Sequence, residues 1–399
     1  MKKEQIIILQ SEISKKNPQI TLEINEFLTE LDYKNISFAG NVFLVGSGGV
    51  ENDFKNKYQN YKEPYFIISY DKNNSLPACL EIISFLKMHK KECYLLSGGA
   101  PLVKEKLSYL MKNNICISYP LKDDKELLRN EKIAYIGDVS SWLIASYIED
   151  EVITNKFGAE IIHIDYDEFI EAINNVKKVD NTRFKEKKNK IISLTEINKA
   201  LKIYYALKDL IKKHNITALT IKCFDLLDIK HTTSCLALAL LNEEGITSSC
   251  EGDMPSLISM LLLKKIVNKP SFQVNPSYIN EEKNYGYFAH CTLPLNMAKQ
   301  YSFDTHFESG IGIGIKGELK NASITILKVN NDLSRFVCYE GKIICSLNET
   351  NLCRSQVKIL LDDPIENILS SPFGNHLLII YGKEKSSLIS RLSSSNLHN

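Results

Sequence analysis

Short apolar runs alternate with helical patterns along the first third of the chain. Three such runs end in glycine or aspartate, as strands often do, and lie at residues 41–49, 65–71 and 92–99. Between the last two, residues 75–91 carry apolar positions at helical spacing. Ser75 is the candidate cap of this helix and Pro77 falls in its first turn. The alternation predicts a parallel sheet with helical crossovers.

The same alternation continues in a second unit. Within residues 132–147 a predicted strand passes through Gly137 and Asp138 into a predicted helix, and residues 160–176 repeat that step. A long helix is predicted over residues 194–215, with a cap-like Thr-x-x-Asn start. Further strands, with helices between them, are predicted at residues 216–227, 245–253 and 270–275.

Beyond residue 276 the pattern changes to alternating or β-rich runs separated by Gly, Asn and Asp. Little helical periodicity remains there, so this part is expected to be mainly antiparallel. The fold class predicted from the whole chain is α/β, with two doubly wound parallel-sheet domains followed by a β-rich C-terminal domain. The expected boundaries give domains of residues 1–127, 128–270 and 271–399, with a pocket between the second and third.

Composition and charge limit the classes of partner. The 399 residues are 44% hydrophobic and 24% charged, close to the averages of globular proteins. With 49 Lys plus Arg against 48 Asp plus Glu, no nucleic acid or anionic membrane is expected as a partner. The Lys-rich stretch at residues 183–190 is interpreted as a solvated linker.

Neither a membrane span nor a secretory signal is expected. No segment reaches the run of about 18 apolar residues that a span needs, and the N-terminal residues lack a small-residue cleavage pattern. These observations predict a cytoplasmic protein. Its ten cysteines are scattered singly, so free thiols packed as small apolar residues are expected.

The segment ITSSCEGDMPSLISM, residues 246–260, raises the first question of chemistry. Asp253 stands directly before Met254 and Pro255, where a helix N-cap accepts backbone N–H groups, and a cap explains it. Glu251 is not explained in that way. It lies at the carboxyl end of a predicted parallel strand, where ligands of α/β folds collect, and Gly252 leaves room for a close approach. Position alone leaves an exposed loop residue and a site residue both open.

Three histidines of the C-terminal third stand in small-residue or turn settings, namely His290, His306 and His376. One histidine on an apolar strand is usually a core residue with its hydrogen bonds made. Together with an unexplained glutamate, three of them point to a divalent metal, because imidazole and carboxylate suit Mn²⁺, Zn²⁺, Fe²⁺ or Co²⁺. No local spacing such as His-Glu-x-x-His is present.

The order of several motifs resembles one family. The series CEGD, a strand ending in VNP, FAHC, the strand GIGIGIKG and GNH is similar to the L-fucose and L-arabinose isomerase superfamily, in particular its shorter fucose-isomerase-like branch. The segments KNNSLPACLEI, GDVSSWLIAS, IKCFDLL and NLCRSQV also resemble that branch, so the likeness covers nearly the whole chain. It implies aldose–ketose isomerisation with Mn²⁺ or a similar ion. It also implies a homotrimer or homohexamer in which a neighbour's first domain helps to close the pocket.

The resemblance also assigns roles residue by residue. Glu251 matches a glutamate that serves as metal ligand and acid/base, His376 matches the C-terminal metal-binding histidine, and His290 matches a ligand of the arabinose branch. One position departs from the family. Asn275 stands where the family places a second carboxylate, and an amide can offer an oxygen to a metal but cannot exchange a proton near neutral pH.

Proton transfer then needs a substitute for that carboxylate. The candidates are Asp253, Asp304, Glu308 and His306, whose ordinary pKa of roughly 6.5 suits the task. If DTHFESG is extended, its alternation puts Asp304, His306 and Glu308 on one face. A salt-bridged or solvated strand face explains Asp304 and Glu308 equally well.

Three further features carry less weight. GSGG at residues 46–49 follows a predicted strand but lacks Gly-x-Gly-x-x-Gly spacing and a clear helix directly behind it, which favours a tight turn over a phosphate cradle. Asp225 ends a predicted strand and either lines the pocket or starts a turn. Cys223 and Cys291 have no recognisable base beside them in the sequence.

Two functions remain open at this stage. The first is a metal-dependent isomerase that interconverts an aldose and a ketose through a cis-enediol, acting on an L-fucose-like deoxysugar, a pentose or a modified sugar. Its expected metal ligands are Glu251, Asn275, His290 and His376, and its expected acid/base groups are Glu251, His306 and Asp304. The alternative is a divergent relative that binds a sugar or metabolite in the same pocket without isomerising it.

Overall fold

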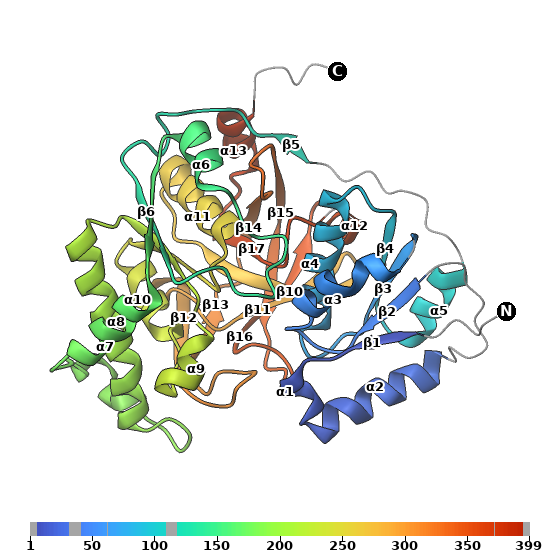
Figure 1. Cartoon of the computed structure of the whole chain (residues 1–399), viewed down its shortest axis with the longest axis horizontal. Coiled ribbons are helices and arrows are strands. Elements are labelled where there is room, and N and C mark those ends of the chain that lie inside the picture. The colour runs from blue at the N-terminus through green and yellow to red at the C-terminus, as the bar shows by residue number, and fades with distance from the viewer. Residues whose placement is uncertain (1–5, 32–40, 62, 109–117, 371, 394–399) are drawn as a thin grey trace.

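The computed structural model describes residues 6–31, 41–61, 63–108, 118–370 and 372–393. Two parallel four-stranded sheets and one larger antiparallel sheet build the molecule, and a two-stranded ribbon is added to them. This confirms a mixed α/β chain with a β-rich C-terminal region. In Figure 1 the two parallel sheets, with their helices, lie on either side of the antiparallel strands.

The first parallel sheet has the strand order β1 (Ile7–Leu9), β2 (Asn41–Val45), β3 (Tyr65–Ser69) and β4 (Cys93–Ser97). One face packs against α2 (Pro18–Leu31) and α5 (Ala100–Ser108), and the other against α3 (Glu51–Lys57) and α4 (Ser75–Met88). Two short helices complete the unit, α1 (Glu12–Lys15) and η2 (Tyr58–Asn60). The sequence analysis predicted three of these strands but missed β1.

The start of α4 differs from its prediction. Ser75 is the first helical residue rather than the cap, because Asn74 precedes it in the left-handed conformation with φ of 56°. The Ser75 hydroxyl donates instead to the backbone oxygen of Val45 at the end of β2. Pro77 lies in the first turn, as predicted. This bond fixes the N-terminus of α4 beside the strand ends.

The second parallel sheet has the order β7 (Glu160–Ile164), β6 (Lys132–Ile136), β8 (Ala218–Ile221) and β9 (Thr247–Cys250). One face is covered by α6 (Asp150–Phe157) and α11 (Met254–Val267). The other face is covered by α7 (Tyr166–Asn175), α8 (Leu194–His214) and α10 (Cys235–Glu243). The helix α9 (Asp225–Lys230) and the 3-10 helix η3 (Thr182–Lys187) connect these elements.

Two predictions in this unit are wrong. The segment after β6, residues 139–149, is a series of turns, and a helix begins only at Asp150. Buried Glu81 of α4 explains the difference, because its carboxylate accepts hydrogen bonds from the Ala145 backbone N–H and the Ser146 hydroxyl. For α8, the cap is Ser193 rather than the predicted Thr-x-x-Asn start, since the Ser193 hydroxyl accepts from the Glu196 N–H at 3.2 Å.

Six long antiparallel strands of the C-terminal region close into a barrel. Their order around it is β14 (Ser323–Val329), β17 (Leu377–Tyr381), β10 (Phe272–Asn280), β11 (Tyr285–His290), β16 (Ser355–Leu361) and β15 (Arg335–Ser346), and β15 pairs again with β14. The short β5 (Tyr119–Pro120) adds to the edge of β15. The ribbon and the small helices are β12 (Ala298–Asp304), β13 (Gly314–Leu319), η4 (Leu295–Met297), α12 (Glu366–Ser370) and α13 (Lys385–Leu392).

The barrel joins the two α/β units through shared cores. The helix α4 packs against β10, and α11 packs against β14 and β17. One apolar cluster contains residues of the first sheet, of α4 and of the barrel strands. These contacts bring strand ends of all three sheets together. The domain boundaries near residues 127 and 270 stay a prediction.

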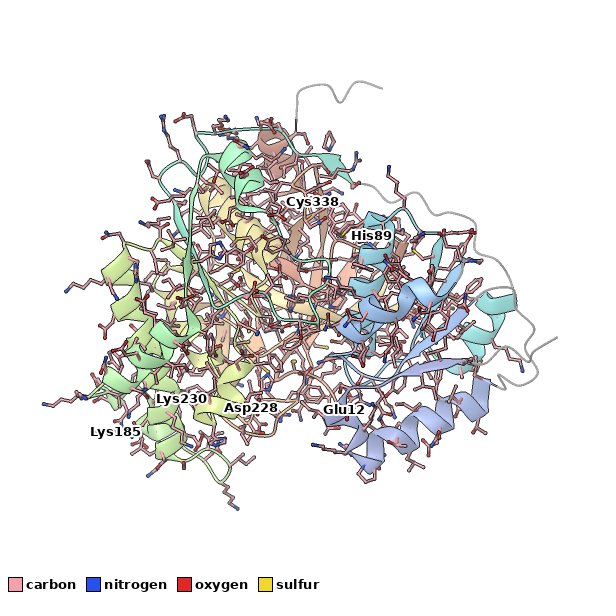
Figure 2. All side chains as sticks on the ribbon, in the orientation of Figure 1. Glu12, His89, Lys185, Asp228, Lys230 and Cys338 are labelled. Carbon is pink, nitrogen blue, oxygen red and sulfur yellow. The ribbon has the colours of Figure 1, made fainter. Side chains whose placement is uncertain are left out.

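The remaining predictions from the sequence concern the Lys-rich stretch, the cysteines and membrane-spanning helices. Lys185, in the Lys-rich stretch, is exposed at the outer edge of the molecule (Figure 2), which agrees with a solvated linker. All nine cysteines within the described part of the chain are free thiols, as predicted. In that same part, no helix combines the length and apolar character that crossing a bilayer requires.

Candidate functional site

Glu251 stands at the carboxyl end of β9 in an unusual backbone conformation. Its φ is +67°, in the left-handed region that few residues other than glycine adopt, and Gly252 follows with φ of +75°. A Cβ on residue 252 would lie 2.6 Å from the Asp138 backbone oxygen, so only glycine fits there. The Ser140 N–H donates to the Glu251 backbone oxygen at 3.0 Å. This tight turn aims the Glu251 side chain away from the sheet.

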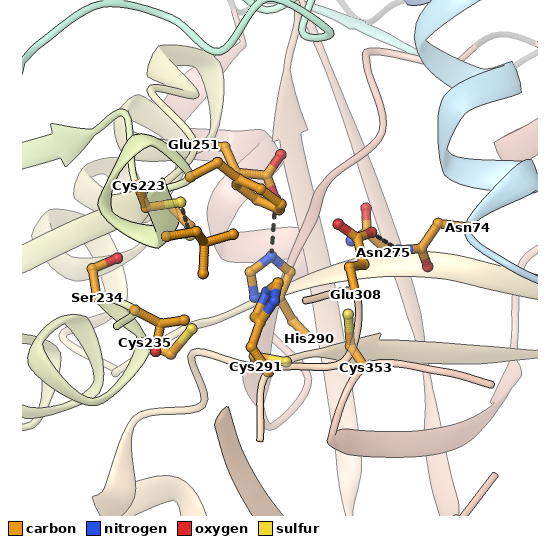
Figure 3. A pocket seen from close by; sticks show the side chains of 15 residues that line it. Asn74, Cys223, Ser234, Cys235, Glu251, Asn275, His290, Cys291, Glu308 and Cys353 are labelled. Carbon is orange, nitrogen blue, oxygen red and sulfur yellow. Dashed lines mark hydrogen bonds and ion pairs between the residues drawn. The ribbon is translucent and has the colours of Figure 1, made fainter. Parts of the chain in front are cut away.

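The Glu251 carboxylate is held between an indole and two imidazoles. Its Oε2 accepts a hydrogen bond from Trp142 Nε1 at 2.7 Å. Its Oε1 lies 3.7 Å from Nε2 of His290 and 3.5 Å from Nε2 of His376 (Figure 3 shows the first pair). Burial raises the pKa of Glu251, but the neighbouring imidazoles outweigh burial and hold that pKa well below its usual range. The group is therefore a carboxylate at neutral pH.

His376, directly before β17, is fully buried and is oriented by Asp253. Its Nδ1 lies 2.8 Å from Asp253 Oδ2, while its Nε2 has no hydrogen-bond partner among the described residues. Burial lowers the pKa of His376, but the two carboxylates of Glu251 and Asp253 outweigh burial and raise it to about 9. A carboxylate on one ring nitrogen and a free second nitrogen is the usual arrangement of a metal-binding histidine.

Asp253 is the N-cap of α11, as predicted, but the cap is only part of its role. Its Oδ1 accepts from the Ser256 N–H at 2.7 Å. Lys328 of β14, which has no exposed surface, places its Nζ 3.2 Å from Asp253 Oδ2 and 2.7 Å from Ser256 Oγ. Asp253 therefore links the helix start, a buried cation and the site histidine.

His290 and Asn275 come from adjacent barrel strands. His290 ends β11, and its Nδ1 lies 2.9 Å from the Thr292 hydroxyl, which leaves Nε2 to face Glu251. Asn275 lies on β10 opposite Ala289 of β11. Its side-chain oxygen is buried and has no hydrogen-bond partner among the described residues. Glu251, His290 and His376 thus converge, and Asn275 lines the same pocket as Glu251 and His290.

The converging atoms suit a divalent metal. The ligand atoms of Cys250, Glu251 and His290 all lie within 4.8 Å of one another. Nε2 of His376 and the side-chain oxygen of Asn275 are further buried polar atoms that have no hydrogen-bond partner in the described part of the chain. Buried polar atoms of this kind normally have a partner, so a bound cation fits this arrangement. The sequence analysis did not consider Cys250.

The segment DTHFESG is not extended beyond Asp304, so the condition that would put Asp304, His306 and Glu308 on one face of a strand is not met. The strand β12 ends at Asp304, and the segment after it folds into a turn closed by a bond from the Gly310 N–H to the His306 oxygen. The Asp304 carboxylate accepts from the Thr305 N–H and faces Arg354 at 3.9 Å. Asp304 is absent from the described lining of the pocket. The turn instead brings His306 and Glu308 to the pocket wall.

His306 and Glu308 line the same pocket as Glu251 and His290. The His306 ring lies edge-on to Phe224, and burial lowers its pKa. Glu308 is exposed at the mouth of the pocket, and its carboxylate bonds to the Asn74 side chain (Figure 3). Desolvation of its carboxylate and the negative charge of Glu251 raise the pKa of Glu308 above its usual range. An imidazole and a carboxyl group that line one pocket are suited to general acid–base chemistry.

The pocket opens into a larger cavity of about 520 Å³ between the strand ends. That volume is in the range of small-molecule sites. Residues of all three sheet regions line the cavity, among them Ser47, Glu51, Asn74, Trp142, Glu251, Asn275 and Glu308. The loop GSGG belongs to this wall and leads into α3, so the predicted absence of a helix behind it is wrong.

Several site residues were not found from the sequence. Trp142 was predicted no role, although it is the single tryptophan of the chain and follows a strand end. Asn74 lies in the segment KNNSLPACLEI but was also predicted no role, and Glu51 lies in no motif. Asp225 begins α9 and faces Lys222 at 3.3 Å, which fits the turn interpretation. Cys223 places its sulfur 3.2 Å from that of Cys250.

Comparison with known proteins gives one kind of relative. The chain is 22% identical over 381 residues to the sulfoquinovose isomerases of Priestia aryabhattai and Priestia megaterium, which covers 90% of this chain and 82% of each relative. This chain is similar to sulfoquinovose isomerases. The sulfoquinovose isomerase of Clostridium sp. (strain MSTE9) is 30% identical over 113 residues, which covers 28% of this chain. No family model matches.

These relatives agree with the sugar isomerase activity that the sequence resemblance implies. They also agree with a small-molecule sugar as the expected ligand. Membership of the fucose-isomerase-like branch stays a prediction, as do the identity of the metal and the oligomeric state.

Proposed function

We propose that this protein is a metal-dependent isomerase that interconverts an aldose and a ketose. One observation carries the proposal: Glu251 Oε1 faces Nε2 of His290 and of His376 at 3.7 and 3.5 Å, at the end of a cavity of sugar size. The similarity to enzymes named sulfoquinovose isomerase supports the same reaction type. The manganese ion expected from the sequence resemblance is part of the proposal.

Glu251, His290 and His376 would hold the metal, and the Asn275 side-chain oxygen or water would complete its coordination. A bound divalent ion supplies a positive charge that orients two neighbouring sugar oxygens and stabilises the negative charge that develops on them. Asp253 fixes the ring of His376, and Trp142 fixes the second oxygen of Glu251. These outer contacts keep Oε1 turned toward the two imidazoles.

His306 and Glu308 are the groups that we propose to move protons. Asn275 cannot do so, and Glu308 reaches the same cavity from the turn after β12. Transfer of hydrogen between C1 and C2 through a cis-enediol needs a base for the carbon-bound proton and an acid for the neighbouring oxygen. Asp304 is left out of this proposal, because its carboxylate faces Arg354 outside the cavity.

Asn275 also favours the second candidate, a sugar-binding relative that does not isomerise its ligand. The cavity and the metal-type ligands would then serve binding alone. The two candidates differ in one observable: both bind a sugar, but only the isomerase converts it.

The test measures bound metal in the purified protein and then screens aldoses and ketoses for interconversion with Mn²⁺ added. The isomerase proposal predicts product formation that a chelator abolishes and Mn²⁺ restores. Glu308→Gln should lower kcat by at least about 100-fold while the metal content stays unchanged, because it removes a proton carrier and keeps the shape. Stoichiometric metal without turnover of any sugar would favour the binding protein instead.

The expected assembly is also a proposal. We infer a homotrimer or homohexamer in the cytoplasm, in which the first domain of one subunit approaches the cavity of the next. Light scattering at micromolar concentration tests it, and a monomer would contradict it.

A further inference from the structure

The outer wall of the cavity presents buried oxygen atoms that have no hydrogen-bond partner. Among the described residues, such atoms belong to Glu51 Oε2, Asn74 Oδ1 and Asn375 Oδ1. These three residues are only 2%, 8% and 5% exposed, and all line the cavity that contains Glu251. The Asn74 amide nitrogen already donates to Glu308, which leaves its oxygen as the free end. A ligand in this cavity can satisfy the oxygens of Asn74 and Asn375 only by donating hydrogen bonds to them.

The charges of the cavity have a single sign. Five carboxylates line it, from Glu12, Glu51, Asp53, Glu251 and Glu308, and no lysine or arginine lines it in the described part of the chain. Lys15 pairs with Glu12 but is not part of the lining. Figure 2 labels Glu12 of this lining, and the labelled Lys185 lies at the outer edge of the molecule. Glu51 is the exception among these acidic groups, because burial and the nearby carboxylates of Glu81, Glu251 and Glu308 raise its pKa and favour its neutral form.

We propose that the cavity takes an uncharged sugar and discriminates against sugars that carry a sulfonate, carboxylate or phosphate group. The inference rests on the proposed isomerase function and adds the class of substrate. Sugar hydroxyls donate hydrogen bonds to unpaired oxygens, whereas an ionised sulfonate only accepts them. A bound divalent metal would compensate the negative charge of Glu251. It would leave the other acidic side chains of the cavity without a compensating charge. The chain would thus differ in substrate from relatives named for sulfoquinovose, a sulfonated sugar.

The test compares pairs of sugars that differ in one charged group. In each pair the neutral sugar is named first. The three pairs are quinovose and sulfoquinovose, glucose and glucuronate, and galactose and galacturonate. The full-length protein is used with Mn²⁺ in its native assembly, so that side chains of a neighbouring subunit are present. We measure kcat/KM for isomerisation and, separately, the Kd of each sugar from the fluorescence of Trp142, the only tryptophan.

The neutral member of a pair should be favoured by at least about tenfold in kcat/KM or in Kd. Preference for the sulfonated or carboxylated member would overturn the inference and leave the isomerase proposal standing. Binding of the neutral member without conversion of any sugar would support the inference and contradict the isomerase. If no neutral sugar binds, the inference is wrong.

A matched pair of variants tests the charge of the wall itself. Asp53→Asn removes one exposed carboxylate of the cavity lining and adds an N–H donor, so the preference for neutral sugars should shrink about threefold or more. Glu26→Gln removes the same charge from the exposed face of α2, outside the cavity, and should leave the preference unchanged. An equal effect of both variants, or of neither, would show that the cavity carboxylates do not set the discrimination.

Discussion

The indole N–H of Trp142 donates a hydrogen bond of 2.7 Å to Oε2 of Glu251, across 109 residues of sequence. Trp142 lies in the turns after β6, and Glu251 lies at the end of β9. Glu81 of α4 holds the Trp142 segment in place through Ala145 and Ser146, and its second oxygen accepts from the Asn375 N–H beside His376. One buried carboxylate thus positions parts of the site that come from different sheets.

The first prediction concerns this bond. Trp142→Phe removes the donor to Glu251 and should weaken metal binding by about 10- to 100-fold, the usual effect of losing an outer contact to a metal ligand. Isothermal titration with Mn²⁺ measures it. Tyr147→Phe on the same segment removes a hydroxyl that donates to exposed Glu149, so this control should bind metal normally. Equal metal affinity in Trp142→Phe and the parent would show that the bond does not support the ligand.

The second prediction concerns His376 as a metal ligand. His376→Ala removes the buried Nε2 that faces Glu251 and should abolish retention of metal through purification. His163→Ala is the matched control, because His163 is exposed and pairs with Asp150 on the surface. Circular dichroism confirms that each variant is folded, and atomic absorption gives its metal content. Full metal content in folded His376→Ala would exclude His376 from the site.

The third prediction gives the pH dependence of metal binding. The pKa of His376 is raised to about 9, so a proton occupies the imidazole at neutral pH and must leave before a metal binds. Affinity for Mn²⁺ should therefore rise by up to about tenfold per pH unit from pH 6.5 to 8.5, with release of protons on binding. A flat affinity over that interval, measured by titration in two buffers of different ionisation enthalpy, would contradict this prediction.

The fourth prediction concerns Asp253, which the sequence explained as a helix cap and also offered as a candidate for proton transfer. Asp253→Ala also leaves the fully buried Lys328 without its partner, so the free energy of unfolding should fall by about 3–5 kcal/mol. Ser193→Ala removes only the cap of α8 and should cost about 0.5–2 kcal/mol. Urea unfolding measures both.

The double variant Asp253→Ala/Lys328→Met separates the cap from the buried charge. Replacing Lys328 by an apolar side chain of similar length should recover most of the lost stability. If Asp253→Ala costs no more than Ser193→Ala, the cap accounts for the whole effect of Asp253.

Local patterns predicted much of the fold, because helices such as α8 and strands such as β7 follow their own periodicity. The Asp253 cap was predictable for the same reason, since a cap depends on neighbouring residues only. The segment after β6 was not predictable. Its apolar spacing suits a helix, but Glu81 from another sheet region binds its backbone in a turn.

The order of residues along the chain predicted only part of the site. Glu251 could be placed at a strand end by its pattern, whereas the meeting of His290 and His376 beside it depends on closure of the barrel. The sequence could not decide which residue replaces the carboxylate that is missing at Asn275. Glu308 reaches the cavity through a turn, whereas the alternation of its segment suggests a strand.

Isomerisation in D₂O tests the central claim most directly. The Mn²⁺-loaded protein is incubated with a neutral aldose, and the product is examined by NMR and mass spectrometry. Proton transfer through a cis-enediol by exchangeable side chains predicts a ketose that carries solvent deuterium at C1, and Glu308→Gln should not form it. A protein with full metal content that neither converts any aldose or ketose nor exchanges the sugar's carbon-bound hydrogen would contradict the account.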